Sequence, residues 1–194
     1  MGDKWGFANT HGEIVIEPVW DAAWPFSEGL AKIKQGNKYG FINTKGEVVI
    51  ELVWDDTWSF SEDRAKIKQG NKYGFINAKG EVVIEPVWDD ATLFVNSLSA
   101  VMQGNKWGFI NTKGEVVIEP VWDMLESFSE GLASVNLGDK WGYINMMGEI
   151  VVEPVWDNVR SFSKGFAWVK QGDSIYYINM NGEIVAGDST SSNK

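Results

Sequence analysis

The chain alternates short apolar runs with polar breaks that contain glycine, and the same alternation returns at regular intervals. In one copy, residues 38–43 and 64–69 place apolar side chains between polar ends, while residues 47–54 form a run rich in valine and isoleucine that ends in tryptophan. Short runs of this kind, bounded by turn residues, are typical of β-strands. We therefore predict three strands per copy, over residues 38–43, 47–54 and 64–69.

The breaks between these runs predict two tight turns. Asn43-Thr44-Lys45-Gly46 suits a type I turn followed by a left-handed glycine, which closes a three-residue hairpin loop. Glycine followed by Asn or Asp, as in Gly36-Asn37, suits a two-residue type II′ turn. The unit from Leu30 to Trp54 therefore folds as one antiparallel meander, and residues 55–63 carry the chain to the next.

These turns set a register that sorts the side chains onto two faces. One face is aliphatic and comprises Ala31, Ile33, Gly40, Ile42, Val48 and Ile50. The other is aromatic with a charged border and comprises Lys32, Lys34, Tyr39, Phe41, Val49 and Glu51, with Lys34 and Glu51 flanking Tyr39. Because neither apolar face can be left in water, we expect the meanders to stack, aliphatic face against aromatic face. Gly40 then lets a ring of the neighbouring meander approach the backbone.

The period is 34 residues throughout. It is visible in two sets of equivalent positions, Trp5, Tyr39, Tyr73, Trp107 and Trp141, and Asn9, Asn43, Asn77, Asn111, Asn145 and Asn179. Helical tetratricopeptide repeats have the same length, but no stretch here is rich enough in helix formers for two helices. We predict an all-β chain in which residues 1–187 form one array of five 34-residue repeats plus a terminal half repeat, followed by a disordered tail over residues 188–194.

Two arrangements of these meanders fit the sequence. The first is an open superhelical stack, and the alternative is a five- or six-bladed propeller-like ring. The first copy lacks the strand that precedes the others, and no strand of that kind follows the last copy to close a ring onto the first hairpin. We therefore favour the open stack.

The repeated residues resemble the WG repeat family, also called KWG repeats. Lys-Trp-Gly occurs at residues 4–6, 106–108 and 140–142, and tyrosine replaces the tryptophan at Tyr39 and Tyr73. The match continues through Ile-Asn-x-x-Gly-Glu-Val-Val-Ile-Glu-Pro-Val-Trp-Asp and the following Phe-Ser-Glu-Gly-Leu-Ala, so it covers nearly the whole chain. The resemblance implies a non-catalytic β-repeat module of bacterial type, and it brings no catalytic residues to transfer.

Charge and composition narrow the function classes. Seventeen basic residues against 27 acidic ones give a net charge of −10, which repels phosphate backbones, so we expect no nucleic acid partner. The absence of cysteine excludes disulfides, thiolate metal sites and a cysteine nucleophile. No apolar run approaches the ~20 residues of a membrane span, and no signal peptide is visible. We therefore expect no membrane insertion and a cytoplasmic location, unless the chain is cut from a longer exported protein.

No constellation of residues predicts catalysis. His11 is the only histidine, and a single imidazole without cysteine cannot build a common zinc site or a Ser-His-Asp triad. The carboxylates Glu13, Glu17 and Asp21 recur in the same surroundings from copy to copy, whereas a glycosidase needs two carboxylates in different environments. We interpret them as a solvated row that keeps the valine-rich edges from aggregating. We expect no enzymatic activity, no cofactor and no metal.

The tryptophans are the remaining candidates for a binding site. The tryptophan that ends each valine-rich run does not vary, which indicates a core position; it is Trp20, Trp54, Trp88, Trp122 and Trp156. The residues after it do vary, and Trp24 and Trp58 stand among them in connecting segments, where binding residues collect. Our candidate ligand-binding residues are Trp24 and Trp58 with the nearby Asp21 and Asp55, although the two tryptophans could instead cover gaps between units. Trp168 replaces a lysine and is expected to cap the stack.

Three functions from different classes fit these observations. A rigid repeat array can present its variable loops and acidic strands to a protein partner. Alternatively, Trp24 and Trp58 stack on sugar rings in a carbohydrate-binding module, or the near-identical copies form a purely structural spacer without a ligand. The oligomeric state does not follow from the sequence.

Overall fold

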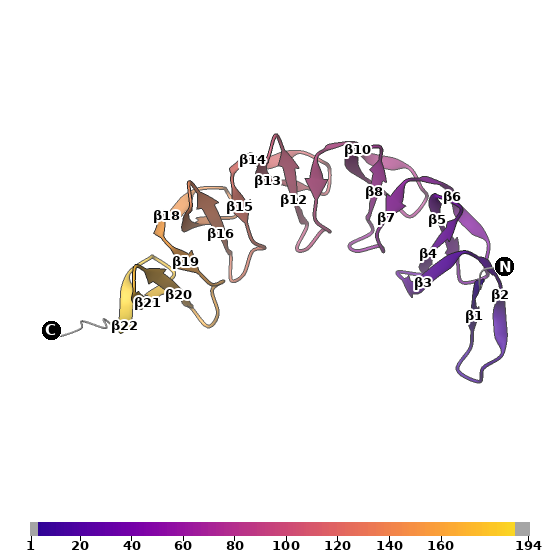
Figure 1. Ribbon diagram of the computed structural model, residues 1–194, viewed down its shortest axis with the longest axis horizontal. Coiled ribbons are helices and arrows are strands. Elements are labelled where there is room, and N and C mark those ends of the chain that lie inside the picture. Colours follow the sequence, from indigo (N-terminus) through magenta and orange to yellow (C-terminus); the bar gives the residue numbers. More distant parts are fainter. Residues whose placement is uncertain (1–3, 189–194) are drawn as a thin grey trace. The chain divides into compact units, whose positions relative to one another are not determined.

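The computed structural model describes residues 4–188, and every regular element within them is a β-strand (Figure 1). A hairpin comes first, formed by β1 (Trp5–Ala8) and β2 (Ile14–Trp20). Five sheets of four strands follow, and in each the strands lie side by side in chain order. The predicted fold class, an all-β series of tandem antiparallel meanders, is confirmed.

The strands of the five sheets have the following bounds. The first sheet comprises β3 (Ala22–Ser27), β4 (Leu30–Gln35), β5 (Lys38–Asn43) and β6 (Val48–Trp54), and the second β7 (Asp56–Thr57), β8 (Ala65–Gln69), β9 (Lys72–Ile76) and β10 (Val82–Trp88). The third comprises β11 (Asp90–Ala91), β12 (Leu98–Gln103), β13 (Lys106–Asn111) and β14 (Val116–Trp122). The fourth comprises β15 (Met124–Leu125), β16 (Leu132–Leu137), β17 (Lys140–Asn145) and β18 (Ile150–Trp156), and the fifth β19 (Asn158–Val159), β20 (Phe166–Gln171), β21 (Ser174–Asn179) and β22 (Ile184–Asp188).

The chain divides into two compact units. The first holds the described residues up to 101 together with 111–115, and the second holds 102–110 and the described residues from 116 onward. No sheet within the described residues joins strands from the two ends of the chain. The single array over residues 1–187 stays a prediction. Of the tail predicted over residues 188–194, Asp188 ends β22, and the rest lies outside the described residues.

The three predicted strands are present in each sheet, and a fourth joins them. The central strand β5 spans the predicted residues 38–43. The other two predicted strands begin one residue later than predicted, β6 at Val48 and β8 at Ala65. The fourth strand, which the pattern does not predict, starts directly after the Trp-Asp pair. The Asp55 amide donates to the Lys68 carbonyl at 3.0 Å, and this hydrogen bond turns the chain back along β8. Residues 55–63 therefore begin the next sheet as well as leading to it.

The hairpin loop between β5 and β6 is the predicted one. The Gly46 amide donates to the Asn43 carbonyl at 3.0 Å, and Gly46 has a φ of +82°. The Asn43 side chain explains why asparagine recurs here. Its Oδ1 accepts from the amides of Lys45 and Glu47, and its Nδ2 donates to the Glu47 carboxylate at 2.7 Å.

The two-residue turns differ from the prediction at two places. Gly104 and Asn105 both have positive φ, at 58° and 64°, and so do Gly138 and Asp139, at 58° and 66°. Two successive residues with positive φ make a type I′ turn, so the predicted type II′ turn is wrong at these positions. Asn and Asp tolerate the left-handed region better than other residues with a side chain, so both sequences can adopt this turn.

The register between β4 and β5 is as predicted, and the register between β5 and β6 is not. Lys34 pairs with Tyr39, which confirms the first. In the second, Tyr39 pairs with Trp54 and Phe41 with Ile50, because bulges place extra residues in β6. Ile50 therefore lies beside Phe41 on the aromatic face, contrary to the prediction. Trp54, and not Glu51, is the partner of Tyr39.

Gly40 lies against the bulged strand. A Cβ atom at this position would lie 2.4 Å from the Ile50 carbonyl oxygen and 3.0 Å from the Glu51 carbonyl carbon. The prediction that a ring of the neighbouring meander approaches this glycine is wrong, because the close neighbour is the backbone of its own sheet. Glycine is needed here so that the bulge can form.

Each unit is held together by sheets that pack face to face. In the first unit, one buried cluster joins Phe41, Ile50 and Trp54 of the first sheet to Phe60, Ala65, Ile67 and Ile76 of the second. In the second unit, another joins Leu132, Tyr143, Val152 and Trp156 to Val159, Phe162, Ala167, Val169 and Ile178. The predicted packing of aromatic face on aliphatic face is confirmed within each unit. The recurring tryptophans are only 5–9% exposed, which confirms their core position: Trp20, Trp54, Trp88, Trp122 and Trp156.

Candidate functional site

The indoles of Trp24 and Trp58 lie against the central strands of the first two sheets. Trp24 is part of β3, Trp58 follows β7, and both are half-buried. The Trp24 ring centroid is 6.0 Å from that of Tyr39, and the Trp58 centroid is 5.8 Å from that of Tyr73. Each predicted platform therefore covers a tyrosine of its own sheet.

A lysine connects the two tryptophans. The Lys32 Nζ lies 4.4 Å from the ring centroids of both Trp24 and Tyr39, and 5.8 Å from that of Trp58. It also donates to the Asp56 carboxylate at 2.9 Å and to the Thr57 carbonyl. Rings that surround an ammonium group attract it through their quadrupoles, and the carboxylate adds an opposite charge. The structure thus brings the two predicted tryptophans together around one cation.

The same arrangement recurs one repeat further along the first unit. The Lys66 Nζ lies 3.8 Å from the Trp58 ring centroid and donates to the Ala91 carbonyl at 2.7 Å. Lys66 is buried, and this burial lowers the pKa of its ammonium group, while the charges of Asp90 and Asp56 act in the opposite direction. Trp58 therefore has one lysine from each of two successive sheets against it.

Position pairs eight residues apart change together from repeat to repeat, and we call them the variable pairs. They are Trp24/Lys32, Trp58/Lys66, Thr92/Ala100, Glu126/Ser134 and Arg160/Trp168. Their members contact each other. The Thr92 hydroxyl accepts from the Ala100 amide at 2.9 Å, and the Ser134 hydroxyl donates to Glu126 at 2.8 Å. The Arg160 guanidinium carbon lies 5.6 Å from the Trp168 ring centroid, so cation and ring have exchanged positions relative to the first pair.

This correlation is the signal that the sequence interpretation missed. The residues that follow each Trp-Asp pair vary, and this variation marked Trp24 and Trp58 as candidates. The residues eight positions later vary in a matching way, and the sequence interpretation did not use that second variation. The Trp168 ring faces Arg160, and its role as a cap of the stack stays a prediction.

The predicted aspartates hold neighbouring turns. Asp21 accepts from the Lys4 Nζ at 2.6 Å with one oxygen and from the Gly36 amide at 2.7 Å with the other. Equivalent contacts join Asp55 to Lys38 and Gly70, Asp123 to Lys106 and Gly138, and Asp157 to Lys140 and Gly172. The hydrogen bonds from lysine, followed by those from the glycine amide, lower the pKa of Asp21 and Asp55 below the ordinary carboxyl value. Both oxygens of each carboxylate are engaged within the fold.

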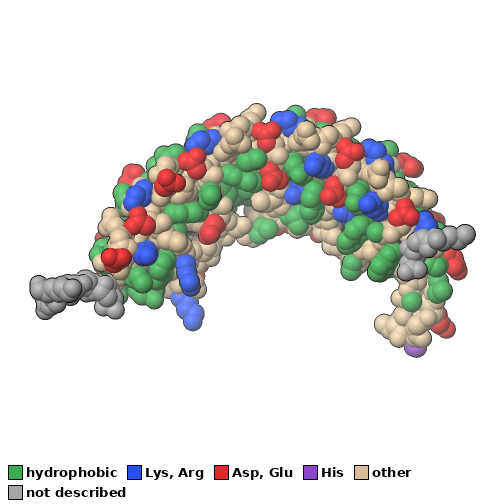
Figure 2. Space-filling view, in the orientation of Figure 1, with side chains coloured by type: hydrophobic (Ala, Val, Ile, Leu, Met, Phe, Trp, Pro, Cys, Tyr) green, Lys and Arg blue, Asp and Glu red, His purple; other side chains and the backbone are tan. Residues whose placement is uncertain are grey.

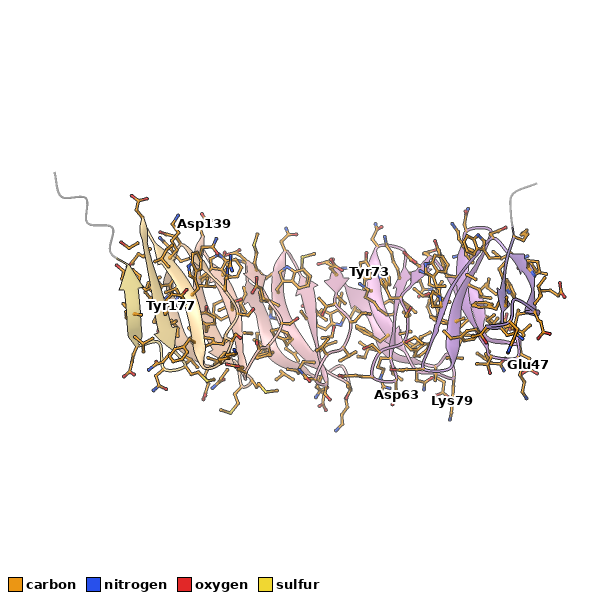
Figure 3. All side chains as sticks on the ribbon, turned by 90° about the horizontal axis from the view of Figure 1, so that it is seen from below. Glu47, Asp63, Tyr73, Lys79, Asp139 and Tyr177 are labelled. Atoms are coloured by element: carbon orange, nitrogen blue, oxygen red, sulfur yellow. The ribbon has the colours of Figure 1, made fainter. Side chains whose placement is uncertain are left out.

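Loop tips of successive sheets are also joined. The Ser27 hydroxyl donates to the Phe60 carbonyl at 3.0 Å. The Glu62 carboxylate accepts from the amides of Asn96 and Ser97 at 2.7 and 2.8 Å, and Glu130 makes the same contacts to residues 164 and 165. In the first unit, the labelled Glu47, Asp63 and Lys79 lie along the same side of the sheets, so hairpin loops and loop tips share that side (Figure 3). The recurring Phe-Ser-Glu-Gly sequence was the available signal for these contacts.

The last strand of each sheet presents aliphatic and acidic side chains to solvent. Val19, Val53, Val87, Val121 and Val155 are 46–54% exposed, and Glu17, Glu51, Glu85, Glu119 and Glu153 are exposed as well. Val48 and Val49, which the sequence assigns to two packed faces, are both 39% exposed. Acidic and basic side chains are interspersed over the face shown in Figure 2. Charges on an edge strand hinder pairing with other chains, which is the role predicted for the carboxylates.

Little else in the described residues offers a reactive centre. His11 is exposed in the loop of the first hairpin. Over residues 4–188, no group of three His, Asp or Glu side chains could hold a metal ion. No helix in the described part of the chain has the length and apolar character to cross a membrane.

A family model described as WG containing repeat matches residues 5–39, 39–73, 73–107, 107–141 and 141–173. The chain belongs to this family. The first four matches each run from one Trp or Tyr to the next, so the boundaries of the WG repeats are offset from those of the sheets. The first sheet, for example, takes β3 and β4 from the first WG repeat and β5 and β6 from the second. Successive WG repeats are therefore joined by the hydrogen bonds of a shared sheet. Among curated proteins, none matches the sequence.

Solved structures resemble the WG-repeat chain in fold. A eukaryotic initiation factor structure has a TM-score of 0.53 at 11% identity, over 94% of this chain and 70% of that one. BamB from Moraxella catarrhalis has a TM-score of 0.48 at 13% identity, over 92% and 65% of the two chains. Hsv2 from Kluyveromyces lactis has a TM-score of 0.48 at 13% identity, over 82% and 60%. The chain thus spans about 60% of the Hsv2 structure that it matches.

Proposed function

We propose that this WG-repeat chain is a non-catalytic scaffold that binds a protein partner through its variable loops. The variable pairs carry the proposal. The hairpin loops and the aspartate contacts are alike from copy to copy, whereas the first member of the pair is tryptophan in two pairs and threonine, glutamate or arginine in the others. The first unit presents Trp24, Trp58 and Thr92, and the second presents Glu126 and Arg160.

The chemistry of these first members of the variable pairs suits a protein surface. Thr92, Glu126 and Arg160 are exposed, and Trp24 and Trp58 are half-buried. Aromatic residues and arginine are enriched in protein interfaces and among the residues that contribute most to binding. A sugar platform needs an open ring face, whereas Trp24 already has Tyr39 and Lys32 against it. This favours the protein partner over the carbohydrate ligand.

Site-specific photo-crosslinking tests the proposal. A photoreactive amino acid is placed at Trp58, Glu126 or Arg160, and as a matched control at Lys79, an exposed hairpin-loop residue that belongs to no variable pair. We expect a discrete crosslinked protein from the variable-pair positions and none from Lys79. Crosslinks of equal yield from all positions, or from none, would contradict the proposal.

A parallel titration addresses the carbohydrate alternative. Tryptophan fluorescence is followed while soluble polysaccharides are added to the wild type and to a Trp24→Ala/Trp58→Ala variant. A protein-binding scaffold gives no saturable change in either. A saturable change in the wild type that disappears in the variant would replace the proposal with a carbohydrate-binding module.

A further inference from the structure

The last sheet leaves a normally buried face uncovered. In the other sheets, one ring of the central strand is covered by the following sheet, and Phe41, Phe75 and Tyr143 are 0% exposed. The equivalent residue on β21 is Tyr177, which is 47% exposed (Figure 3). The residue type is kept, and only its cover is missing.

This uncovered surface, which we call the last-sheet face, is apolar and hollowed. Phe166 is 48% exposed and Val185 49%, whereas Leu132, the equivalent of Phe166, is 6% exposed. Together with Tyr177, Ala186 and Lys164 they line a hollow of about 420 Å³. Contiguous exposed apolar residues on a folded chain indicate an interaction surface.

The first hairpin carries the complementary half of the same packing arrangement. In later copies the glycine of the hairpin loop touches the preceding sheet, as Gly46 does with a Cβ position 3.1 Å from the Ile16 side chain. The equivalent Gly12 has nothing within 4 Å. Ala8 is exposed, whereas Ile42, its equivalent in the first four-stranded sheet, is 0% exposed. Gly12 and Ala8 form what we call the first-hairpin face.

We propose that copies of this chain associate head to tail, with the last-sheet face of one copy against the first-hairpin face of a second. The two faces are the two sides of the interface that joins neighbouring sheets within each unit, where an aromatic face meets an aliphatic one. The chain itself therefore carries a surface of the right kind for each end. Because the two faces differ, the contact is heterologous and can extend from copy to copy.

Features of the two faces define the strength of this contact. The first hairpin lacks the strand that contributes Ala31 and Ile33 to the aliphatic face of the first sheet, so the new interface buries less area than an internal one. Small interfaces give weak, reversible complexes. Each copy also has a net charge of −10, so added salt screens the repulsion and strengthens the association.

Sedimentation velocity over low to high micromolar concentrations tests the proposal. Ala8→Glu blocks the first-hairpin face, Tyr177→Glu blocks the last-sheet face, and Val121→Glu alters an equally exposed apolar residue on neither face. We expect the mass of the wild type and of Val121→Glu to rise above 21.7 kDa with concentration, while each of the other two variants stays at 21.7 kDa.

Mixing the two blocked variants provides the decisive arm. The mixture retains one intact face of each kind, so it forms a complex of twice 21.7 kDa and grows no further. A wild type that stays at 21.7 kDa at every concentration would overturn the proposal, as would a mixture that stays monomeric. Association that survives in both blocked variants would also overturn it, because another surface would then be responsible. Circular dichroism of each variant verifies that its fold is intact.

Discussion

The close approach of the bulged strand to the central-strand glycine leads to a graded stability prediction. Replacing Gly74 by alanine puts a Cβ atom 2.4 Å from the Ile84 carbonyl oxygen and 2.7 Å from the Pro86 nitrogen. Replacing Gly40 gives the same 2.4 Å contact to Ile50, but the next neighbour is the Glu51 backbone at 3.0 Å. Leucine follows Glu51 where proline follows Glu85, so the backbone of β6 can yield more easily than that of β10.

The size of the effect follows from these contacts. Forcing an added carbon into a well-packed site costs about 1–3 kcal/mol, and a backbone neighbour held in a bulge places Gly74→Ala near the upper end. Alanine also has less conformational freedom than glycine in the unfolded chain, which offsets about 0.4–1 kcal/mol of this loss of stability. We therefore expect Gly74→Ala to lower the free energy of unfolding by about 2 kcal/mol, with a smaller loss for Gly40→Ala.

Urea unfolding followed by tryptophan fluorescence measures both variants. The control is Thr44→Ala at an exposed hairpin-loop position, where we expect a change within about 0.5 kcal/mol. If Gly74→Ala unfolds at the same urea concentration as the wild type, the bulged strand moves aside without cost and the close approach does not explain the glycine. If Gly40→Ala is the more destabilised variant, the reasoning about proline is wrong.

Three further predictions concern buried polar groups and charge. The Thr57 hydroxyl is buried without a hydrogen-bond partner among the described residues, so Thr57→Val should stabilise the chain by about 1 kcal/mol in urea unfolding. Thr92→Val should instead destabilise it, because the Thr92 hydroxyl accepts a hydrogen bond from an amide. Lys32→Met removes an ion pair and three ring contacts and should cost about 2 kcal/mol in urea unfolding. Lys34 has one ring contact, at 5.3 Å, so Lys34→Met should cost about 0.5 kcal/mol or less. Equal losses would show that the rings do not matter. Because the pKa of Asp55 is lowered in the folded chain, this residue contributes stability at pH values above the unfolded pKa of about 3.9. That contribution is lost as the pH falls through the folded pKa. The thermal unfolding of Asp55→Asn should therefore depend less on pH in this range than that of the wild type.

The parts of the fold that were predicted correctly depend on local chemistry. The loop from Asn43 to Gly46 is specified by an asparagine that bonds to its own loop and by a glycine with positive φ, and both are visible in the sequence. The register between β5 and β6 depends on a bulge in β6 and on its contact with Gly40, which is a contact between strands. A pattern read one strand at a time contains no sign of such a bulge, so every side-chain assignment after it was shifted.

The candidate site was predicted in part for a similar reason. Variation marked Trp24 and Trp58, and the structure places both around Lys32. Their neighbours could not be deduced, because the short strand that carries Asp56 alongside β8 is two residues long and has no pattern of its own. Asp21 and Asp55 were predicted as binding residues because they lie near the two tryptophans, whereas hydrogen bonds to turns explain their recurrence.

The contact between the two members of each variable pair has a consequence for how such chains change over time. A lone substitution at Trp58 leaves Lys66 buried without the ring that its ammonium group contacts, whereas exchange of both residues for the combination found in another copy restores a matched contact. Single changes at these positions are therefore expected to be selected against, and double changes tolerated. A protein engineer can use the same rule, altering what one repeat exposes by transferring two residues from another repeat while the turns and the sheet remain as they are.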